Sequence, residues 1–387
     1  MTTAAPAAAS SAYIAGDPCL DRITASLPFR ERYRHALGIG DRTLVVVSST
    51  WSDQSALGSR FELLRELLAE LPRDSYAVAA VLHPNIRHHH GPGLIAHWYA
   101  DCLRSGLIML DEIDGWRAGL IAADVLIGDH GAVTGYGAAI GRPTVLAAFT
   151  DTPPGTAISE LGDAAPRLPA HGPYRPIVDA MRGAEFSAAD RIAGLATSEP
   201  GRSLELLRKL FYDLLALPVP PLAAIAALIP QPETISPTGS FADDVLVTPI
   251  AGCAGVDIER RPAEMRRFTD TNSDSHVCCH ADYPVRTLRS HARVLVADRM
   301  DAGPDALGWL RSLLQANPLC ELVALLSDTH LMALHRDGRR FQVDCAGCPG
   351  NAAASALYAI ICAGTTPAAI AVRLGRDRFR ILIEADE

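Results

Sequence analysis

The sequence feature with the clearest chemistry is the segment ADVLIGDHGAV at residues 123–133. Its apolar run ends at Asp129 and passes at once into Gly131 and small residues that begin a helix pattern. A helix N-terminus presents free backbone N–H groups and the positive end of the helix dipole, and both attract phosphate. We therefore predict a phosphate-binding turn formed by Asp129, Gly131, Ala132 and Val133. The alternative is a turn that is rich in glycine only for close packing.

Three other predicted strands also end in polar residues, at 48–51, 83–85 and 111–112. Open α/β sheets bind ligands at the carboxyl edge of their strands. Thr50 could bond a phosphate, Trp51 could stack on a base, and His83 could bond or protonate a phosphate oxygen. Each residue also has a structural alternative: a helix cap for Thr50, packing under its loop for Trp51, and stabilisation of the turn before Pro84 for His83. The convergence of these residues at one edge favours a ligand site.

A metal site is the second chemistry that the residue types allow. Candidate ligands are His276, Cys278, Cys279, His280 and the pair Cys345 and Cys348. Adjacent cysteines point in different directions in any regular backbone, and one CxxC pair arises easily by chance in a chain with nine cysteines. We therefore predict buried or loop cysteines and no metal. The tract at 88–90, three consecutive histidines, is predicted to be a solvated loop.

Residues 43–149 read as repeated strand and helix units. The strands are unbroken apolar runs, which is the pattern of a parallel sheet covered on both faces. Strands are predicted at 43–48, 77–82, 107–110, 125–128 and 143–148, and helices at 61–71, 116–123 and 133–140. The sequence therefore predicts an α/β domain with the polar strand ends on one edge.

A proline-rich stretch at 218–237 follows a predicted helix at 203–217. We place the first domain at 1–235, with its core at 15–217, and a smaller α+β domain at 241–387. The second domain is predicted to contain strands at 293–297, 321–326, 368–374 and 379–384, helices at 305–316 and 351–363, and a hairpin at 331–335 and 339–343 that turns on Asp337-Gly338.

Composition limits the partners of the chain. With 44 acidic and 35 basic residues and a net charge of −9, general attraction to nucleic acid or to an anionic membrane is not expected. The longest apolar run, at 214–230, is interrupted by prolines, so we predict no integral membrane segment. Nine cysteines without a recognisable secretion signal favour reduced thiols. A cytoplasmic location is predicted, with peripheral attachment to the inner face of the membrane left open.

The order of the motifs resembles a known group of enzymes. GDPCLD at 16–21, LVVVSSTW at 44–51, VLHPN at 81–85 and AADVLIGDHGAVTGYGAAIGRPTVLAAF at 122–149 look like the C-terminal half of the CDP-glycerol glycerophosphotransferase-like proteins. More widely, they resemble GT-B glycosyltransferases and UDP-N-acetylglucosamine 2-epimerases. The resemblance covers about residues 12 to 217 and implies a GT-B-like Rossmann domain. The nucleotide contacts that it implies are Thr50, Trp51, His83, and Asp129 with the turn His130, Gly131, Ala132 and Val133.

The sequence departs from the family pattern in two ways. Gly131 and Ala132 stand where the transferases have paired serines, and His130 stands where they have tyrosine, so two hydroxyl donors to phosphate are missing. GT-B enzymes also work in a cleft between two halves, and nothing before Ala15 is long enough to be an acceptor half. We expect that the chain is a fragment, acts with a separate acceptor-domain subunit, or has lost catalysis.

The predicted function is binding of a CDP- or UDP-linked donor and transfer of glycerophosphate or sugar in the synthesis of a cell-envelope polymer. Asp129 and the N–H groups from Gly131 to Val133 are expected to stabilise the leaving diphosphate, with His83 or His130 as catalytic residues. No cofactor is predicted. The alternative is a non-catalytic nucleotide-binding or interaction module.

Overall fold

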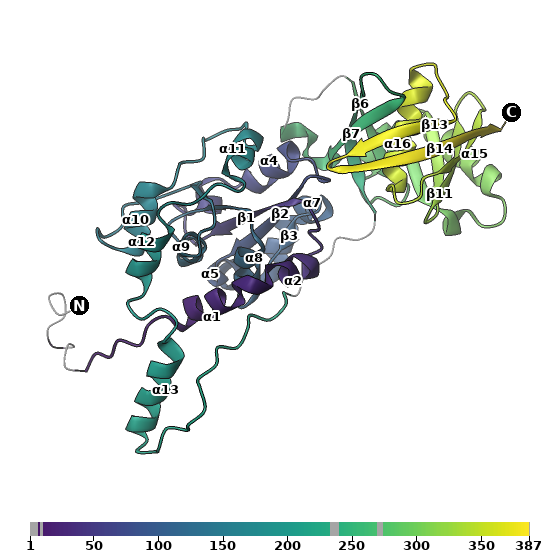
Figure 1. The fold of residues 1–387 in the computed structure, drawn as a ribbon. Coiled ribbons are helices and arrows are strands. Elements are labelled where there is room, and N and C mark those ends of the chain that lie inside the picture. The colour runs from purple at the N-terminus through teal and green to yellow at the C-terminus, as the bar shows by residue number, and fades with distance from the viewer. Residues whose placement is uncertain (1–6, 8–10, 233–239, 269–273, 387) are drawn as a thin grey trace.

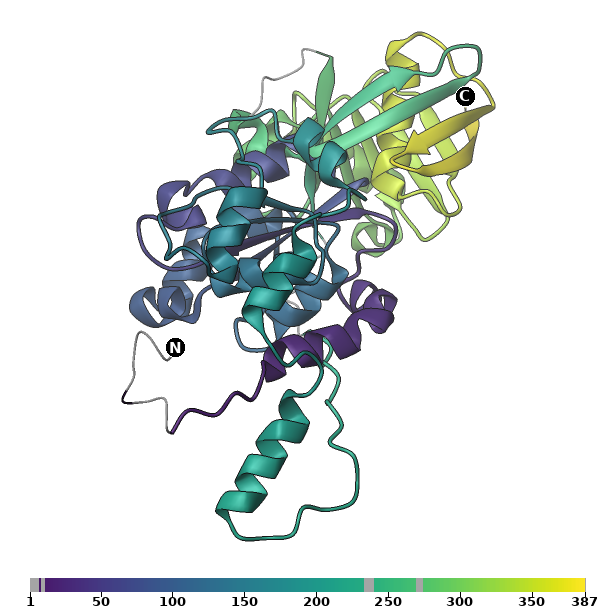
Figure 2. The same cartoon turned by 60° about the vertical axis from the view of Figure 1, so that its left-hand side comes forward.

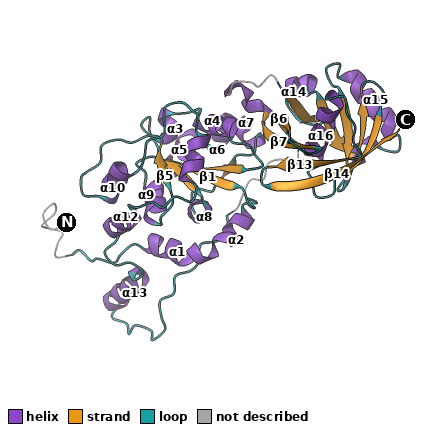
Figure 3. Cartoon of the chain, turned by 45° about the horizontal axis from the view of Figure 1, so that its top comes forward, coloured by secondary structure: helices purple, strands orange, loops and turns teal. Residues whose placement is uncertain are grey.

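The computed structural model describes residue 7 and residues 11–232, 240–268 and 274–386. Two sheets follow one another along the chain (Figure 1). The first is a five-stranded sheet, and the second is a nine-stranded sheet that closes on itself as a barrel. Figure 3 shows them side by side, with helices packed on both faces of the first sheet.

The five-stranded sheet has the order β3-β2-β1-β4-β5, with every neighbouring pair parallel. Its strands are β1 (Thr43–Ser49), β2 (Tyr76–Leu82), β3 (Ile108–Met109), β4 (Val125–Gly128) and β5 (Thr144–Leu146). Every residue of β1 and β2 is buried, which explains why both strands are continuous apolar runs. The predicted α/β domain with a parallel sheet is confirmed.

Alternate residues of β1 pack into different hydrophobic clusters, because successive side chains of a strand point to opposite faces. One cluster packs α1 (Pro18–Ser26), η2 (Leu27–Phe29), α2 (Arg30–Ala36), α8 (Gly115–Ala122) and α9 (Ala132–Ala139) onto the sheet. The other face carries α3 (Ala56–Ser59), α4 (Leu63–Glu70), α5 (Pro84–His90), α6 (Pro92–Trp98), α7 (Ala100–Arg104) and α11 (Arg175–Met181). The remaining helices are α10 (Ala157–Ala164), α12 (Ala189–Ala196) and α13 (Ser203–Leu214).

The barrel has the strand order β10-β11-β12-β14-β13-β7-β6-β8-β9. Its strands are β6 (Ala242–Pro249), β7 (Gly255–Pro262), β8 (Ser275–His280), β9 (Val294–Asp298), β10 (Leu322–Leu326), β11 (His330–His335), β12 (Arg340–Asp344), β13 (Ala369–Leu374) and β14 (Asp377–Asp386). Its helical segments are η3 (Ala263–Phe268), α14 (Arg286–His291), η4 (Arg299–Ala302), α15 (Ala306–Ala316) and α16 (Gly350–Cys362). The predicted hairpin is confirmed as β11 and β12, with Gly338 at φ +99° in the turn.

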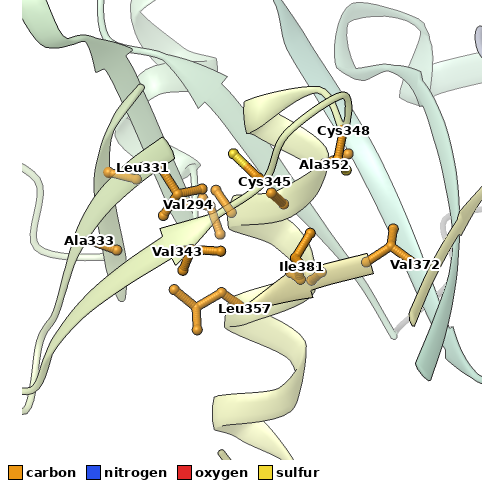
Figure 4. Close-up of a cluster of buried hydrophobic side chains, with 14 of the residues drawn as sticks. Val294, Leu331, Ala333, Val343, Cys345, Cys348, Ala352, Leu357, Val372 and Ile381 are labelled. Carbon is orange, nitrogen blue, oxygen red and sulfur yellow. The ribbon is translucent and has the colours of Figure 1, made fainter. Parts of the chain in front are cut away.

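Helix α16 packs its small residues against the inner face of the barrel strands (Figure 4). Ala352 and Leu357 are fully buried together with Val294 and Val343 of the surrounding strands. Alanines along the helix let the strands approach its backbone closely, so one helix fills the interior.

The second domain differs from the predicted α+β arrangement because β6, β7 and β8 were not expected as strands. In β7 the inward position 260 carries an arginine, which breaks the alternation of apolar and polar residues. Strand β8 reads SHVCCH and was interpreted as a cluster of potential ligands. Its adjacent cysteines belong to two different hydrophobic clusters, as a strand requires: Cys278 packs with α16, and Cys279 packs with α15.

The barrel contacts the first domain at the amino edge of the parallel sheet. Arg73 and Asp74, which precede β2, form ion pairs with Asp243 (2.5 Å) and Arg260 (2.5 Å) of the barrel. Arg104, which precedes β3, binds both carboxylate oxygens of Glu264 at 2.8 Å. Seven residues of β1 span about 20 Å, so the carboxyl edge lies on the far side from the barrel. None of the helices in the described part of the chain has the length and apolar character that crossing a membrane requires.

Candidate functional site

The Asp129 side chain links three segments of the chain at the carboxyl edge of the parallel sheet. Its side chain is fully buried and accepts hydrogen bonds from the backbone N–H groups of Thr50 (2.8 Å), Ala56 (2.8 Å) and Gly131 (2.9 Å). The carboxylate therefore joins the loop after β1, the start of α3 and the start of α9. This corrects the expectation that Asp129 acts directly on a diphosphate, because its oxygens are enclosed by protein donors. Asp129 is a positioning residue.

The N-terminus of α9 is the part of this edge that can receive an anion. Gly131 is its N-cap, and Ala132, the first helical residue, is exposed. The N–H groups of a first helical turn have no partner within the helix, and they point outward along the axis. Thr134 Oγ1 accepts a hydrogen bond from the Asp129 N–H (3.2 Å) and so fixes the entry into the helix. The structure thus presents the Ala132 and Val133 N–H groups at the edge, as the sequence predicts.

Gly131 is required by its protein neighbours. Its φ of −76° is open to any residue, so backbone strain does not explain the glycine. A Cβ at this position would lie 2.9 Å from Asp129 Oδ1 and 3.1 Å from Thr50 Cβ. Glycine is therefore needed because the backbone at residue 131 lies against the loop after β1. This is the close-packing alternative that the sequence left open.

The two predicted catalytic histidines have different surroundings. His83 is the N-cap of α5, and its Nδ1 accepts a hydrogen bond from the Asn85 N–H (3.1 Å). This is the turn-stabilising role that the sequence left open as the alternative. His130 packs edge-on against Phe149, with ring centroids 6.4 Å apart. Its Nδ1 is buried and has no hydrogen-bond partner among the residues that the structure describes.

Trp51 opens onto a cavity of about 950 Å³ beside the ends of β1 and β2. Its side chain is 55% exposed, which contradicts the alternative of packing under the loop. Ser52, the next residue, has a φ of 115°, and its carbonyl oxygen lies 1.9 Å from the position that a Cβ on Gly58 would take. The loop is tightly folded and presents the indole to solvent.

Sequence analysis missed several residues of this site. The cavity is also lined by Phe61, Trp98, Tyr99 and the three histidines at 88–90. These histidines lie in α5, so the prediction that they form a loop is wrong. Arg60 lines a neighbouring hollow of about 530 Å³ at the end of β5, and its Nη1 atom is buried without a hydrogen-bond partner in the described chain. Trp98 and Tyr99 follow an ordinary helix pattern, so only the fold could bring them to the cavity.

The GDPCLD motif has a structural role. Asp17 caps α1 by accepting hydrogen bonds from the Cys19 (2.8 Å) and Leu20 (2.9 Å) N–H groups. Asp21 accepts hydrogen bonds from the backbone N–H groups of Gly201 (2.6 Å) and Ser203 (3.0 Å) at the start of α13. The motif therefore fixes α13 against α1 and lies outside the carboxyl edge.

One group of described residues could approach a metal ion: His280, Asp298 and Asp301. His280 Nδ1 accepts a hydrogen bond from the Asp282 N–H (3.2 Å), and its Nε2 faces Asp298 at 4.0 Å. Both aspartates are exposed, and exposed acidic groups are common without an ion, so we assign no metal to this group.

No protein-family model matches the sequence, and no curated protein sequence matches it. Among solved structures, the chain is similar to the wall teichoic acid polymerase TagF, with 15% identity and a TM-score of 0.36 over 52% of this chain and 50% of that chain. It is also similar to the UDP-GlcNAc 2-epimerase from Neisseria meningitidis, with 13% identity and a TM-score of 0.30 over 51% of this chain and 54% of that chain. These are the two kinds of enzyme that the motifs resemble. The chain spans about half the length of each.

Proposed function

We propose that the parallel-sheet domain binds the diphosphate of a CDP- or UDP-linked donor at the N-terminus of α9. The observation that carries the proposal is the open first turn of α9, held beside the end of β1 by the buried Asp129 carboxylate. In the order β3-β2-β1-β4-β5, the gap between β1 and β4 is where the strand order reverses, and open α/β sheets bind ligands there. The choice of CDP or UDP follows from the sequence resemblance.

Each part of the nucleotide-linked substrate has a protein group at this edge that can bind it. The N–H groups of Ala132 and Val133 take phosphate oxygens, and His130 lies two residues before this first turn of α9. The base stacks on Trp51 in the aromatic cavity. Thr50 connects the two places, since its N–H bonds to Asp129 and the next residue is Trp51.

The proposed reaction is transfer of glycerophosphate or sugar for a cell-envelope polymer. In glycerophosphate transfer an acceptor hydroxyl would attack the β-phosphorus, the P–O–P bond would break and CMP would leave. In sugar transfer the bond between the sugar and the diphosphate would break and UDP would leave. In both cases the α9 dipole and the His130 ring would stabilise negative charge on the leaving phosphate group. His83 can exchange a proton only through Nε2, because Nδ1 is occupied by the Asn85 N–H.

Titrating separate pieces of the donor tests the binding proposal. Calorimetry with pyrophosphate measures the α9 turn alone, cytidine or uridine measures the aromatic cavity alone, and CDP or UDP measures both. Trp51→Ala should weaken nucleoside binding about tenfold, since a stacked base contributes about 1–3 kcal/mol, and should leave pyrophosphate binding unchanged. Phe29→Ala removes an aromatic side chain of similar exposure (45%) elsewhere and serves as the control. If pyrophosphate does not bind at millimolar concentration, and neither CDP nor UDP binds, the proposed site is refuted.

A non-catalytic nucleotide-binding module is the second candidate function. The observation that favours it is the place of the barrel, which contacts the amino edge of the sheet and leaves the carboxyl edge uncovered. A turnover assay of the full chain with CDP-glycerol and UDP-sugars separates the two candidates. Enzymatic rates of ~1 per second or more would establish transfer, and binding without turnover would establish the module.

A further inference from the structure

An arm projects from the parallel-sheet domain at the end of the molecule remote from the barrel (Figures 1 and 2). It consists of α13 and the returning segment 215–230. Figure 2 shows α13 leading outward and the returning segment running back to the body in an extended form.

Both ends of the arm are fixed to the body. At the outgoing end, Asp21 caps the start of α13. At the returning end, Ile229 is buried, its N–H donates to Ser26 Oγ (3.1 Å), and its carbonyl accepts from the buried Tyr33 hydroxyl (2.8 Å). The arm therefore has a defined direction and is not a loose linker.

The tip of the arm has a specific turn. Ala216 has a φ of +52°, and the Leu217 N–H donates to the Tyr212 carbonyl (3.0 Å) while the Ala216 N–H donates to the Asp213 carbonyl (3.1 Å). This pair of bonds is a Schellman motif, which ends a helix and reverses the chain. Behind the turn, Arg208 Nη1 donates to the Leu222 carbonyl (2.5 Å) and ties the two limbs together.

The arm exposes four large apolar side chains, two at the end of α13 and two on the returning segment. Ile225 is 84% exposed, Leu222 76%, Leu214 75% and Leu215 66%. Residues 214–232 contain no charged side chain. Surfaces of this kind are uncommon on monomeric soluble proteins and mark interaction sites.

The arm also borders a hollow. A cavity of about 1120 Å³ lies between α1, α12, α13 and the returning segment, and its lining combines apolar groups of Leu20, Ala193 and Leu204 with the charged residues Asp190, Glu205 and Arg208. Across a two-fold axis the same surface of two copies meets itself, so the exposed apolar side chains of both arms would be buried together. We propose that this arm is a self-association surface, in which the exposed apolar side chains of the arm pack against those of the arm of a second copy of the chain.

Charge favours a second copy over a lipid surface. Each chain carries a net charge of −9, so two copies repel wherever charged surfaces meet. The charge-free segment 214–232 lets two copies approach without placing like charges together. Membrane-binding segments usually add basic residues next to the apolar ones, and here Arg208 and Lys209 are balanced by Glu205 and Asp213.

The test is the molar mass of the full chain in solution, measured by light scattering after size exclusion. The chain of 41.2 kDa should have about twice that mass at micromolar concentration. Leu214→Ser combined with Ile225→Ser should raise the dissociation constant at least tenfold and shift the mass toward the monomer. Both side chains are mostly exposed, so the fold should persist, and an unchanged thermal midpoint of the circular dichroism signal checks this.

The matched control replaces two exposed apolar residues outside the arm, Ile113→Ser and Met300→Ser, which are 69% and 91% exposed. The control should remain a dimer. A wild-type monomer at 100 µM, or a dimer that the arm variant leaves intact, would overturn the proposal. A wild-type monomer that sediments with phosphatidylcholine vesicles, while the arm variant does not, would assign the arm to lipid and also overturn it.

Discussion

Replacing Asp129 by asparagine tests whether its buried carboxylate organises the carboxyl edge. The carboxylate accepts two N–H groups on Oδ2 and one on Oδ1. Asparagine has one acceptor oxygen, so it can keep the two bonds on Oδ2, and its NH₂ group then faces the Gly131 N–H at about 2.9 Å. One charge-assisted bond is lost, two donors oppose each other in a buried site, and the two remaining bonds weaken. The expected loss is about 3 kcal/mol, a large share of the stability of an ordinary domain.

The assay is urea denaturation at pH 7, followed by circular dichroism, with the midpoint and slope compared between variants. Asp111→Asn is the matched control, because Asp111 Oδ2 also accepts three backbone N–H groups, from Ile113, Asp114 and Gly115. That side chain is partly exposed and uses a single oxygen, so asparagine can preserve all three bonds at a loss below about 1 kcal/mol. An Asp129→Asn loss as small as that of the control would refute the positioning role.

Three further substitutions have defined outcomes. Gly131→Ala should lower the free energy of unfolding by about 1–3 kcal/mol through overpacking. Gly194→Ala is the control and should not be destabilising, because a Cβ there meets nothing within 4 Å. The urea midpoints of the two variants are compared with that of the wild type. Burial lowers the pKa of His276 from 6.5 to about 4, so the unfolded chain binds the proton first as pH falls. Wild type should therefore lose up to about 3 kcal/mol between pH 6.5 and 4 relative to His276→Phe, and parallel pH profiles of the two proteins would contradict this. Arg260→Leu should destabilise by about 3–5 kcal/mol, because it leaves Asp74 without its buried partner, and Asp74→Leu in the same chain should recover part of the loss in urea denaturation.

The parallel sheet was predictable because each of its long strands can be recognised from its own residues. A strand covered on both faces is apolar at every position, so β1 and β2 stand out in the sequence without knowledge of their partners. The barrel was not predictable in this way. Strand β13 pairs with β7 across more than 100 residues, and the inward Arg260 is stabilised by Asp74 of the first domain and by Asn351 of α16.

Sequence analysis likewise predicted one part of the candidate site and missed the other. The turn at Gly131 and the exposed Trp51 lie at the edge where sequence analysis placed them. The role of Asp129 could not be predicted, because the N–H groups that enclose its carboxylate include those of Thr50 and Ala56, more than 70 residues away. Periodicity likewise gives no sign that Trp98 faces a cavity with Trp51. Residues 233–237, the last part of the predicted linker, lie outside the described residues.

The most direct measurement of the proposed diphosphate site is a titration of the ¹⁵N-labelled, deuterated chain with pyrophosphate, followed by amide NMR spectra. The proposal predicts saturable shifts at Ala132 and Val133 at millimolar concentration. The start of α13 is a second helix N-terminus, already capped by Asp21, and its Ser203 amide should not move. Unchanged amides at the start of α9, or equal shifts at both helix starts, would contradict the account.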